Sequence, residues 1–184
     1  MTDKLVIALA QLNPTVGKIG ANLKKLREMR KKAAEEGADL ILTSELYTCG
    51  YPPEDLVRKP QFISSLRSAV EAFASETSDG GPAVLLGTPW VESDRLHNSL
   101  VLIEGGAITT ARHKYDLPNY GVFDEKRVFD PGPMPGPISF KDVRIGVPIC
   151  EDIWTPEVVE CITETGGEII LVPNGSPFEG GKTD

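Results

Sequence analysis

The strongest constraint on the fold is the alternation along the chain of short apolar runs with longer stretches of helical periodicity. Residues 4–11 and 39–43 are apolar runs of strand length, and between them apolar residues recur at helical spacing from Asn22 to Glu36. This alternation is typical of α/β proteins, whose helices pack against a largely parallel sheet. We therefore expect an α/β fold, with Gly37 ending the first helix.

The rest of the chain continues this pattern. We expect a second helix over residues 61–76 and a third from Pro156 to about Thr165. Residues 114–136 are rich in Pro, Gly, Asn and Asp and have no regular period, which predicts an irregular loop of functional importance. Further apolar runs predict strands at 83–87, 98–103, 107–112, 143–149 and 168–172.

Composition and charge argue against several classes of function. The chain has 184 residues and a formal charge of -8, from 27 acidic and 19 basic side chains. This balance disfavours nucleic acid and anionic membrane surfaces as partners, and no apolar run is long enough to predict a membrane span. Three irregularly spaced cysteines indicate reduced thiols, so we expect a cytoplasmic protein. With only two histidines, a histidine-rich metal site is not expected, and glycine-rich phosphate loops are missing.

Three chemically reactive residues have the same kind of position in the predicted fold. Glu45 follows one buried strand, Lys114 follows the second strand of a predicted hairpin, and Cys150 ends another strand. Ligand sites of α/β folds gather outside the carboxyl ends of strands, so these side chains are candidates for one site. From position alone, each also has a structural reading: a capping carboxylate, a solvated ammonium and a small buried apolar residue.

A thiol, a carboxylate and an amine form a complete set for nucleophilic catalysis without histidine. A carboxylate can take the proton of the thiol, and an ammonium favours the thiolate and stabilises the oxyanion that forms when sulfur attacks a carbonyl. The backbone N–H of Glu151, which follows Cys150, is a candidate for a second oxyanion donor. For Cys49 and Cys161, packing is the preferred reading, and for the two histidines it is ordinary hydrogen bonding.

The sequence words around these residues resemble a known family. They read SELYTCGYPPEDL from Ser44, HKYDLPNYGVFDEKRVF from His113 and GVPICEDIW from Gly146. In this order they resemble the nitrilase superfamily of carbon–nitrogen hydrolases. The wording is most similar to the glutamine amidotransferase domains of glutamine-dependent NAD synthetases. The resemblance runs from about Lys4 to the last residue, and it implies an α-β-β-α sandwich that pairs with a second copy, so we expect a homo-oligomer.

The resemblance assigns a role to each matching residue. It implies Glu45 as general base, Lys114 as the oxyanion-stabilising lysine and Cys150 as the nucleophile that attacks the side-chain amide of glutamine. Substrate-binding positions carried over with the family's words are Tyr120, Glu151, Ser176 and Lys182. The hydroxyl groups of Tyr and Ser and the ammonium group of Lys suit the charged α-groups of glutamine.

The resemblance also implies what lies outside these 184 residues. In the family, ammonia travels to a synthetase domain, where ATP and Mg²⁺ activate deamido-NAD; the Ser-Gly-Gly-x-Asp-Ser loop of that domain is missing from this sequence. We therefore expect residues 1–184 to form an incomplete hydrolase domain that needs no cofactor of its own. Two alternatives remain open, namely a free-standing amidase or carbamoylase of the superfamily and an inactive binding or assembly module.

Overall fold

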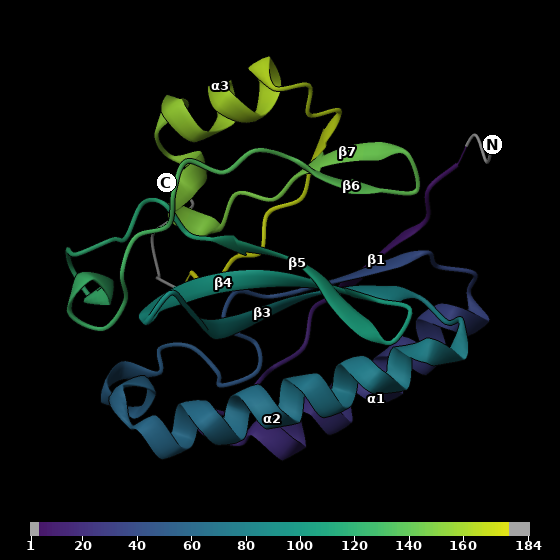
Figure 1. Cartoon of the computed structure of the whole chain (residues 1–184), viewed down its shortest axis with the longest axis horizontal. Helices are drawn as coiled ribbons and strands as arrows, with labels where there is room; N and C mark the ends of the chain where they lie inside the picture. Colours follow the sequence, from purple (N-terminus) through teal and green to yellow (C-terminus); the bar gives the residue numbers. More distant parts are fainter. Residues whose placement is uncertain (1–3, 177–184) are drawn as a thin grey trace, which may run out of the picture.

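The computed structural model describes residues 4–176 as two sheets that pack face to face, with helices outside (Figure 1). No helix in this part of the chain is long and apolar enough to cross a membrane. The α-helices and strands are β1 (Ile7–Ala10), α1 (Ile19–Glu35), β2 (Leu40–Thr43), α2 (Pro60–Glu76), β3 (Ala83–Glu92), β4 (Arg95–Glu104), β5 (Ala107–His113), β6 (Ile138–Phe140), β7 (Val143–Gly146), α3 (Pro156–Glu164) and β8 (Ile169–Ile170). Short 3₁₀ helices are η1 (Glu54–Arg58), η2 (Thr77–Asp79), η3 (Glu125–Arg127) and η4 (Cys150–Ile153).

The first sheet has the strand order β1-β2-β3-β4-β5. Helices α1 and α2 connect the three parallel strands, whereas β3, β4 and β5 pair antiparallel through two tight turns. Ser93 and Asp94 form the first of these turns, both at positive φ, and Gly105 and Gly106 form the second. Short connections of this kind return the chain beside itself and so produce antiparallel neighbours.

The two faces of the first sheet bury different layers. One face packs on α1 and α2 through a core that includes Leu26, Phe73 and Val101. The other face packs on the second sheet, of order β6-β7-β8, through residues such as Leu102 and Ile145. Figure 1 shows α3 on the outer side of the second sheet. The layers are therefore α-β-β-α, as the resemblance implied.

The structure corrects several predicted boundaries. The three helices begin within three residues of their predicted starts, while β3 and β4 are longer than expected because they continue as a hairpin beyond the core. Strand β6 was not predicted, because its three residues are too few to show a period. The strand expected over 143–149 ends at Gly146, so Cys150 does not end a strand but begins η4.

Candidate active site

The three reactive side chains come from segments that follow β2, β5 and β7. Glu45 lies two residues after β2, Lys114 directly follows β5, and Cys150 begins η4. The segment after β2 runs tightly against β3, where a Cβ atom on Gly87 would lie 2.2 Å from the carbonyl oxygen of Ser44. Because only glycine permits this approach, Gly87 sets the position of the turn that carries Glu45.

Lys114 is the centre of a buried charge cluster. Its Nζ atom donates to Oε1 of Glu45 at 2.7 Å and to both oxygens of Glu125 at 2.9 and 3.1 Å. The side chains of Lys114 and Glu45 are each 0% exposed and that of Glu125 is 6% exposed. Buried charges in proteins are paired and hydrogen-bonded, and here one ammonium serves two carboxylates.

This arrangement perturbs the titration of the cluster. Burial alone would lower the pKa of Lys114, but the carboxylates of Glu45 and Glu125 outweigh it and raise the pKa, which keeps the amine charged. Burial, followed by the neighbouring Glu45 carboxylate, raises the pKa of Glu125. The cluster therefore holds a fixed positive charge beside two carboxylates that repel each other.

The two oxygens of Glu45 have different surroundings. Oε1 accepts hydrogen bonds from Lys114 and, at 2.7 Å, from Nδ2 of Asn98 on β4. Oε2 has no hydrogen-bond partner among the described residues, although it is buried. A Cβ atom on Gly175 would lie 2.9 Å from Oε2, so the free oxygen faces the backbone of that residue.

Cys150, at the start of η4, contacts the segment that contains Gly175. Its backbone is in the left-handed region with φ of 48°, and its N–H donates to the carbonyl oxygen of Pro173 at 3.0 Å. Its Sγ atom lies 3.1 Å from Oδ1 of Asn174 and 3.9 Å from Oγ of Ser176, and the backbone N–H of Gly175 also reaches it. Gly175 thus lies between the thiol and the free oxygen of Glu45. A strained backbone at a nucleophilic residue is typical of functional sites.

The free thiol is protonated at neutral pH. Burial, followed by the negative charge of Glu45, raises the pKa of Cys150 to about 11, although the Lys114 ammonium acts in the opposite direction. The ammonium alone therefore does not supply the thiolate. A base must accept the proton as sulfur attacks, and the unbonded oxygen of Glu45 is the candidate.

Asp152 joins the segments that carry Lys114 and Cys150. Its Oδ1 atom accepts the backbone N–H groups of Tyr115 and Asp116 at 3.0 and 2.8 Å, and Oδ2 accepts that of Ile149 at 2.9 Å. Burial raises the pKa of Asp152 to about 6 in spite of these three donors. This carboxylate fixes η4 against the residues that follow β5.

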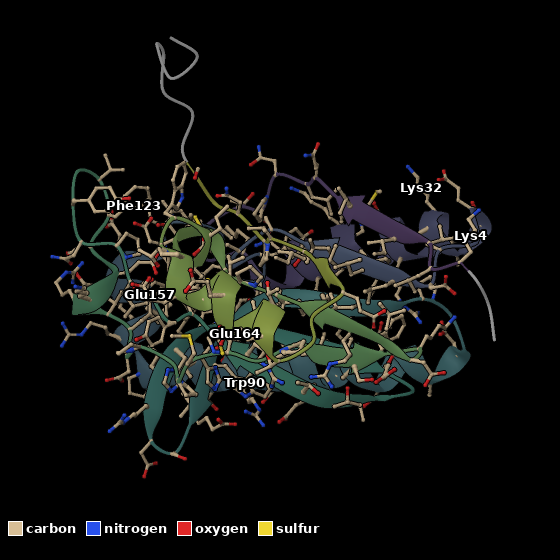
Figure 2. The ribbon with its side chains drawn as sticks, turned by 90° about the horizontal axis from the view of Figure 1, so that it is seen from above. Lys4, Lys32, Trp90, Phe123, Glu157 and Glu164 are labelled. Carbon is tan, nitrogen blue, oxygen red and sulfur yellow. The ribbon has the colours of Figure 1, made fainter. Side chains whose placement is uncertain are left out.

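The predicted substrate-binding residues are placed in part. The hydroxyl of Tyr120 donates to the carboxylate of Glu151 at 2.9 Å, and Tyr120 is 58% exposed. Phe123 packs edge-on to Tyr120, and Figure 2 shows this residue at the end of the molecule opposite to Lys4 and Lys32. Glu151 directly follows Cys150, and Ser176 lies beside its thiol. The polar side chains of Tyr120, Glu151 and Ser176 are referred to as the rim of the site. Lys182 lies outside the described residues.

Cys49, His97 and His113 are packed or hydrogen-bonded within the fold. Cys49 is fully buried, and burial raises its pKa. His97 and His113 stack at 4.2 Å between ring centroids, and each has a hydrogen-bond partner. Within residues 4–176 no group of three metal-ligating side chains is present. For Cys49 and the two histidines, these environments agree with the packing and hydrogen-bonding roles expected from the sequence.

Two members of the cluster were not identified from the sequence. Glu125 lies in the irregular segment after Lys114, next to the similar Asp124, and no local pattern separates the two. Asn98 was read only as the start of a strand. An amide side chain at the start of the apolar run from Leu100 to Ile103 was the available signal.

Fold and site together define a class: α-β-β-α proteins in which a buried carboxylate–lysine cluster faces a single thiol. A family model described as carbon-nitrogen hydrolase matches residues 6–183. The chain therefore belongs to the carbon–nitrogen hydrolase family, as the three sequence words implied.

Curated relatives with high coverage of this chain are glutamine-dependent NAD(+) synthetases. The chain is 41% identical to the glutamine-dependent NAD(+) synthetase of Rhodobacter capsulatus, over 100% of this chain and 33% of the relative. It is 39% identical to the enzyme of that name from Thermotoga maritima, over 97% of this chain and 31% of the relative. The chain thus spans about a third of the length of the curated relatives that it matches.

Solved structures of both a synthetase and an amidase superpose on this chain. The glutamine-dependent NAD+ synthetase of Acinetobacter baumannii superposes with a TM-score of 0.89 at 36% identity, over 96% of this chain and 33% of that one. An amidase from Nesterenkonia superposes with a TM-score of 0.82 at 27% identity, over 98% of this chain and 70% of that one. The fold is thus common to synthetase and amidase relatives.

Proposed function

We propose that this chain hydrolyses the side-chain amide of glutamine through a thioester on Cys150. In the whole protein, the released ammonia would serve ATP-dependent amidation of deamido-NAD, with ATP and Mg²⁺ bound outside this chain. The observation that carries the proposal is the different surroundings of the two Glu45 oxygens. Oε1 is held by Lys114 and Asn98. Oε2 has no partner among the described residues and faces Gly175, whose backbone N–H reaches the thiol.

The first half of the reaction forms the thioester. As Sγ of Cys150 bonds to the amide carbon, its proton passes to Oε2 of Glu45, and the carbonyl oxygen becomes an oxyanion. An ammonium has three N–H donors. In Lys114, one can serve each carboxylate while the third turns to the oxyanion, which the N–H of Glu151 also approaches. Glu45 then gives its proton to the leaving nitrogen, the carbon–nitrogen bond breaks, and ammonia departs.

The second half returns the enzyme to its starting state. Water gives a proton to Glu45 and bonds to the thioester carbon, and the oxyanion is held by the same donors. The carbon–sulfur bond then breaks, glutamate leaves, and the proton from Glu45 returns to sulfur. One carboxylate thus acts alternately as base and acid, a role for which its unbonded oxygen is available.

Glutamine, rather than a simple amide, is favoured by the rim of the site. The carboxylate of Glu151, which Tyr120 fixes by its hydrogen bond, suits the α-ammonium group of an amino acid. Ser176 lies next to the thiol and can bind the same end of the substrate. Lys182 would contribute an ammonium for the α-carboxylate, as the resemblance implies.

The Cys150→Ala variant tests the mechanism. Because Cys150 supplies the thiol that forms the thioester in this mechanism, we expect glutamine hydrolysis in the intact protein to fall by about a millionfold, to background. Release of glutamate and ammonia from isotopically labelled glutamine measures it. Cys49→Ala is the matched control, since this thiol is buried in the core. Undiminished hydrolysis in Cys150→Ala would refute the mechanism.

An amidase without glutamine preference is the second candidate, and the Nesterenkonia structure at 27% identity favours it. A panel of linear amides compared with glutamine separates the two, because turnover of simple amides alone indicates an amidase. In a Nesterenkonia amidase mutant, acrylamide is joined by Michael addition at the active-site cysteine. For this chain, equal and slow labelling of Cys49, Cys150 and Cys161 by such an electrophile would instead indicate an inactive module.

A further inference from the structure

Asn98 is placed between the two carboxylates of the buried cluster. Its Nδ2 atom donates to Oε1 of Glu45 at 2.7 Å and to Oε2 of Glu125 at 3.2 Å. An amide nitrogen carries two hydrogens, so one can serve each carboxylate. Asn98 is 0% exposed, so this bridge lies in the protein interior.

Strand pairing sets the amide beside the ammonium. The backbone N–H of Lys114 donates to the carbonyl oxygen of Asn98 at 2.8 Å, which continues the antiparallel pairing of β4 and β5. Cross-strand neighbours on one face lie close together. The cation and the neutral donor therefore approach Glu45 from adjacent strands.

The other end of the amide shows that this orientation has a cost. Oδ1 of Asn98 is buried and has no hydrogen-bond partner among the described residues. An unpaired buried acceptor destabilises a fold. Turning the amide over would place Oδ1 against two carboxylates, so only the observed orientation is compatible with the cluster. A residue that filled space here would be apolar, as Leu100 and Leu102 are farther along the strand.

We propose that Asn98 is a positioning residue that decides which oxygen of Glu45 is free to act as the base. By binding Oε1 together with Lys114, it leaves Oε2 directed to the side of Cys150. By donating to both Glu45 and Glu125, it also keeps the two carboxylates from sharing a proton. Neighbouring carboxylates without such donors share one, and then neither is a fully ionised base.

The test compares Asn98→Ala and Asn98→Asp with a matched control in the intact protein. Thr77→Val is the control, because the Thr77 hydroxyl is also buried and hydrogen-bonded but lies beside the β4–β5 turn, far along the strands from Asn98. Three quantities are measured for each variant: kcat and KM for glutamine against pH, the rate at which iodoacetamide labels each cysteine, and the melting temperature.

For Asn98→Ala we expect kcat to fall roughly 10- to 100-fold while KM changes little, because the base is displaced and the substrate rim is intact. The acid limb of the pH profile should move up by about one unit, since loss of a donor favours the protonated carboxylates. Asn98→Asp, which keeps the volume and adds a third carboxylate, should move it further. Thr77→Val should lose stability and keep the profile.

Labelling makes the test independent of the substrate. A proton held by the two carboxylates removes negative charge near Cys150, so its labelling at pH 7 should become about threefold faster or more as turnover falls. Cys49 and Cys161 should label as in the wild type, which excludes general loosening.

This inference rests on the proposed function only for the choice of glutamine. A wild type inactive on glutamine would refute that function and leave the labelling comparison valid. Wild-type pH profiles and Cys150 labelling in both Asn98 variants would overturn the inference.

Discussion

At the scale of single residues, the site separates two roles that one carboxylate must combine. Glu45 is held by its Oε1 atom, and Oε2 has no partner among the described residues. Burial, followed by the charge of Glu45, raises the pKa of Cys150 to about 11. In the proposed mechanism, the same residue therefore suppresses the thiolate in the resting state and accepts the proton during attack. The Glu45 carboxylate would thus both keep the Cys150 thiol protonated before substrate binds and accept its proton once substrate is bound.

Glu45→Gln should separate these two effects. The amide cannot accept a proton, so turnover of glutamine should fall by roughly 10²- to 10⁴-fold. Its loss of charge should lower the pKa of Cys150, and alkylation by iodoacetamide at pH 7–9 should become faster. Stopped-flow turnover and mass spectrometry of the labelled cysteine measure the two rates. Slower alkylation in this variant would contradict the assigned cause of the raised pKa.

At the scale of elements, the site depends on contacts between segments that have no regular structure. Asp152 of η4 accepts N–H groups from the residues after β5, and Thr155 donates to Asp116 at 2.6 Å in the same region. Backbone donors in irregular segments have no neighbouring strand to bond. The carboxylate supplies what secondary structure does not and so fixes Cys150 relative to Lys114.

The titration of Asp152 predicts a pH dependence of stability. Its pKa of about 6 in the folded protein lies above the ordinary value of 3.8. A raised pKa stabilises the fold fully below the unfolded value and loses this contribution as pH rises through the folded value. We expect the unfolding free energy of the wild type, relative to Asp152→Asn, to decrease by about 2–3 kcal/mol between pH 3.5 and 7.5. Denaturant titrations of both proteins measure it, and a constant difference would be contrary to the prediction.

Sequence reasoning reached the regular elements because their signals are local. Gly37 and Pro156 mark a helix end and a helix start by backbone chemistry alone, and the three helices were predicted closely. Strand β6 and the true position of Cys150 were missed because three-residue strands and 3₁₀ turns leave no period. Element type followed from the sequence, whereas the ends of irregular segments depended on tertiary contacts.

The site divides in the same way. Glu45, Lys114 and Cys150 follow strands and carry recognisable words, so the sequence pointed to each of them. Asn98 contacts Glu45 and Glu125 across 53 and 27 residues of chain, respectively. Strand pairing and a buried loop bring these residues together in the cluster. No local pattern encodes such a contact.

At the scale of the whole molecule, the two sheets enclose the site from both sides. The first sheet supplies Asn98 and Lys114 from β4 and the end of β5, and the second sheet leads through β7 to the turn of Cys150. The apolar layer between the sheets, which includes Leu102 and Phe140, connects these two halves. The distance between base and nucleophile is therefore a property of sheet packing, and cavities in this layer should affect both stability and rate.

The buried cluster of Glu45, Lys114 and Glu125 sets activity against stability. Its three charges have left water, and replacing such groups with apolar side chains of similar size is often stabilising by about 1–4 kcal/mol. We expect the Glu45→Leu, Lys114→Met and Glu125→Leu triple variant to unfold at higher denaturant concentration than the wild type and to be inactive. Equilibrium unfolding in guanidinium measures this, and a less stable triple variant would count against it.

The consequence concerns how this protein can be improved by selection. Loss of one member alone would leave a buried charge without its partner, so a screen for resistance to unfolding would favour removal of the cluster only when all three charges are replaced together. By this argument the buried charges lower the free energy of unfolding of the chain. The packing of the apolar layers on either side must offset that loss. Engineering for robustness should therefore change those layers and leave the cluster intact.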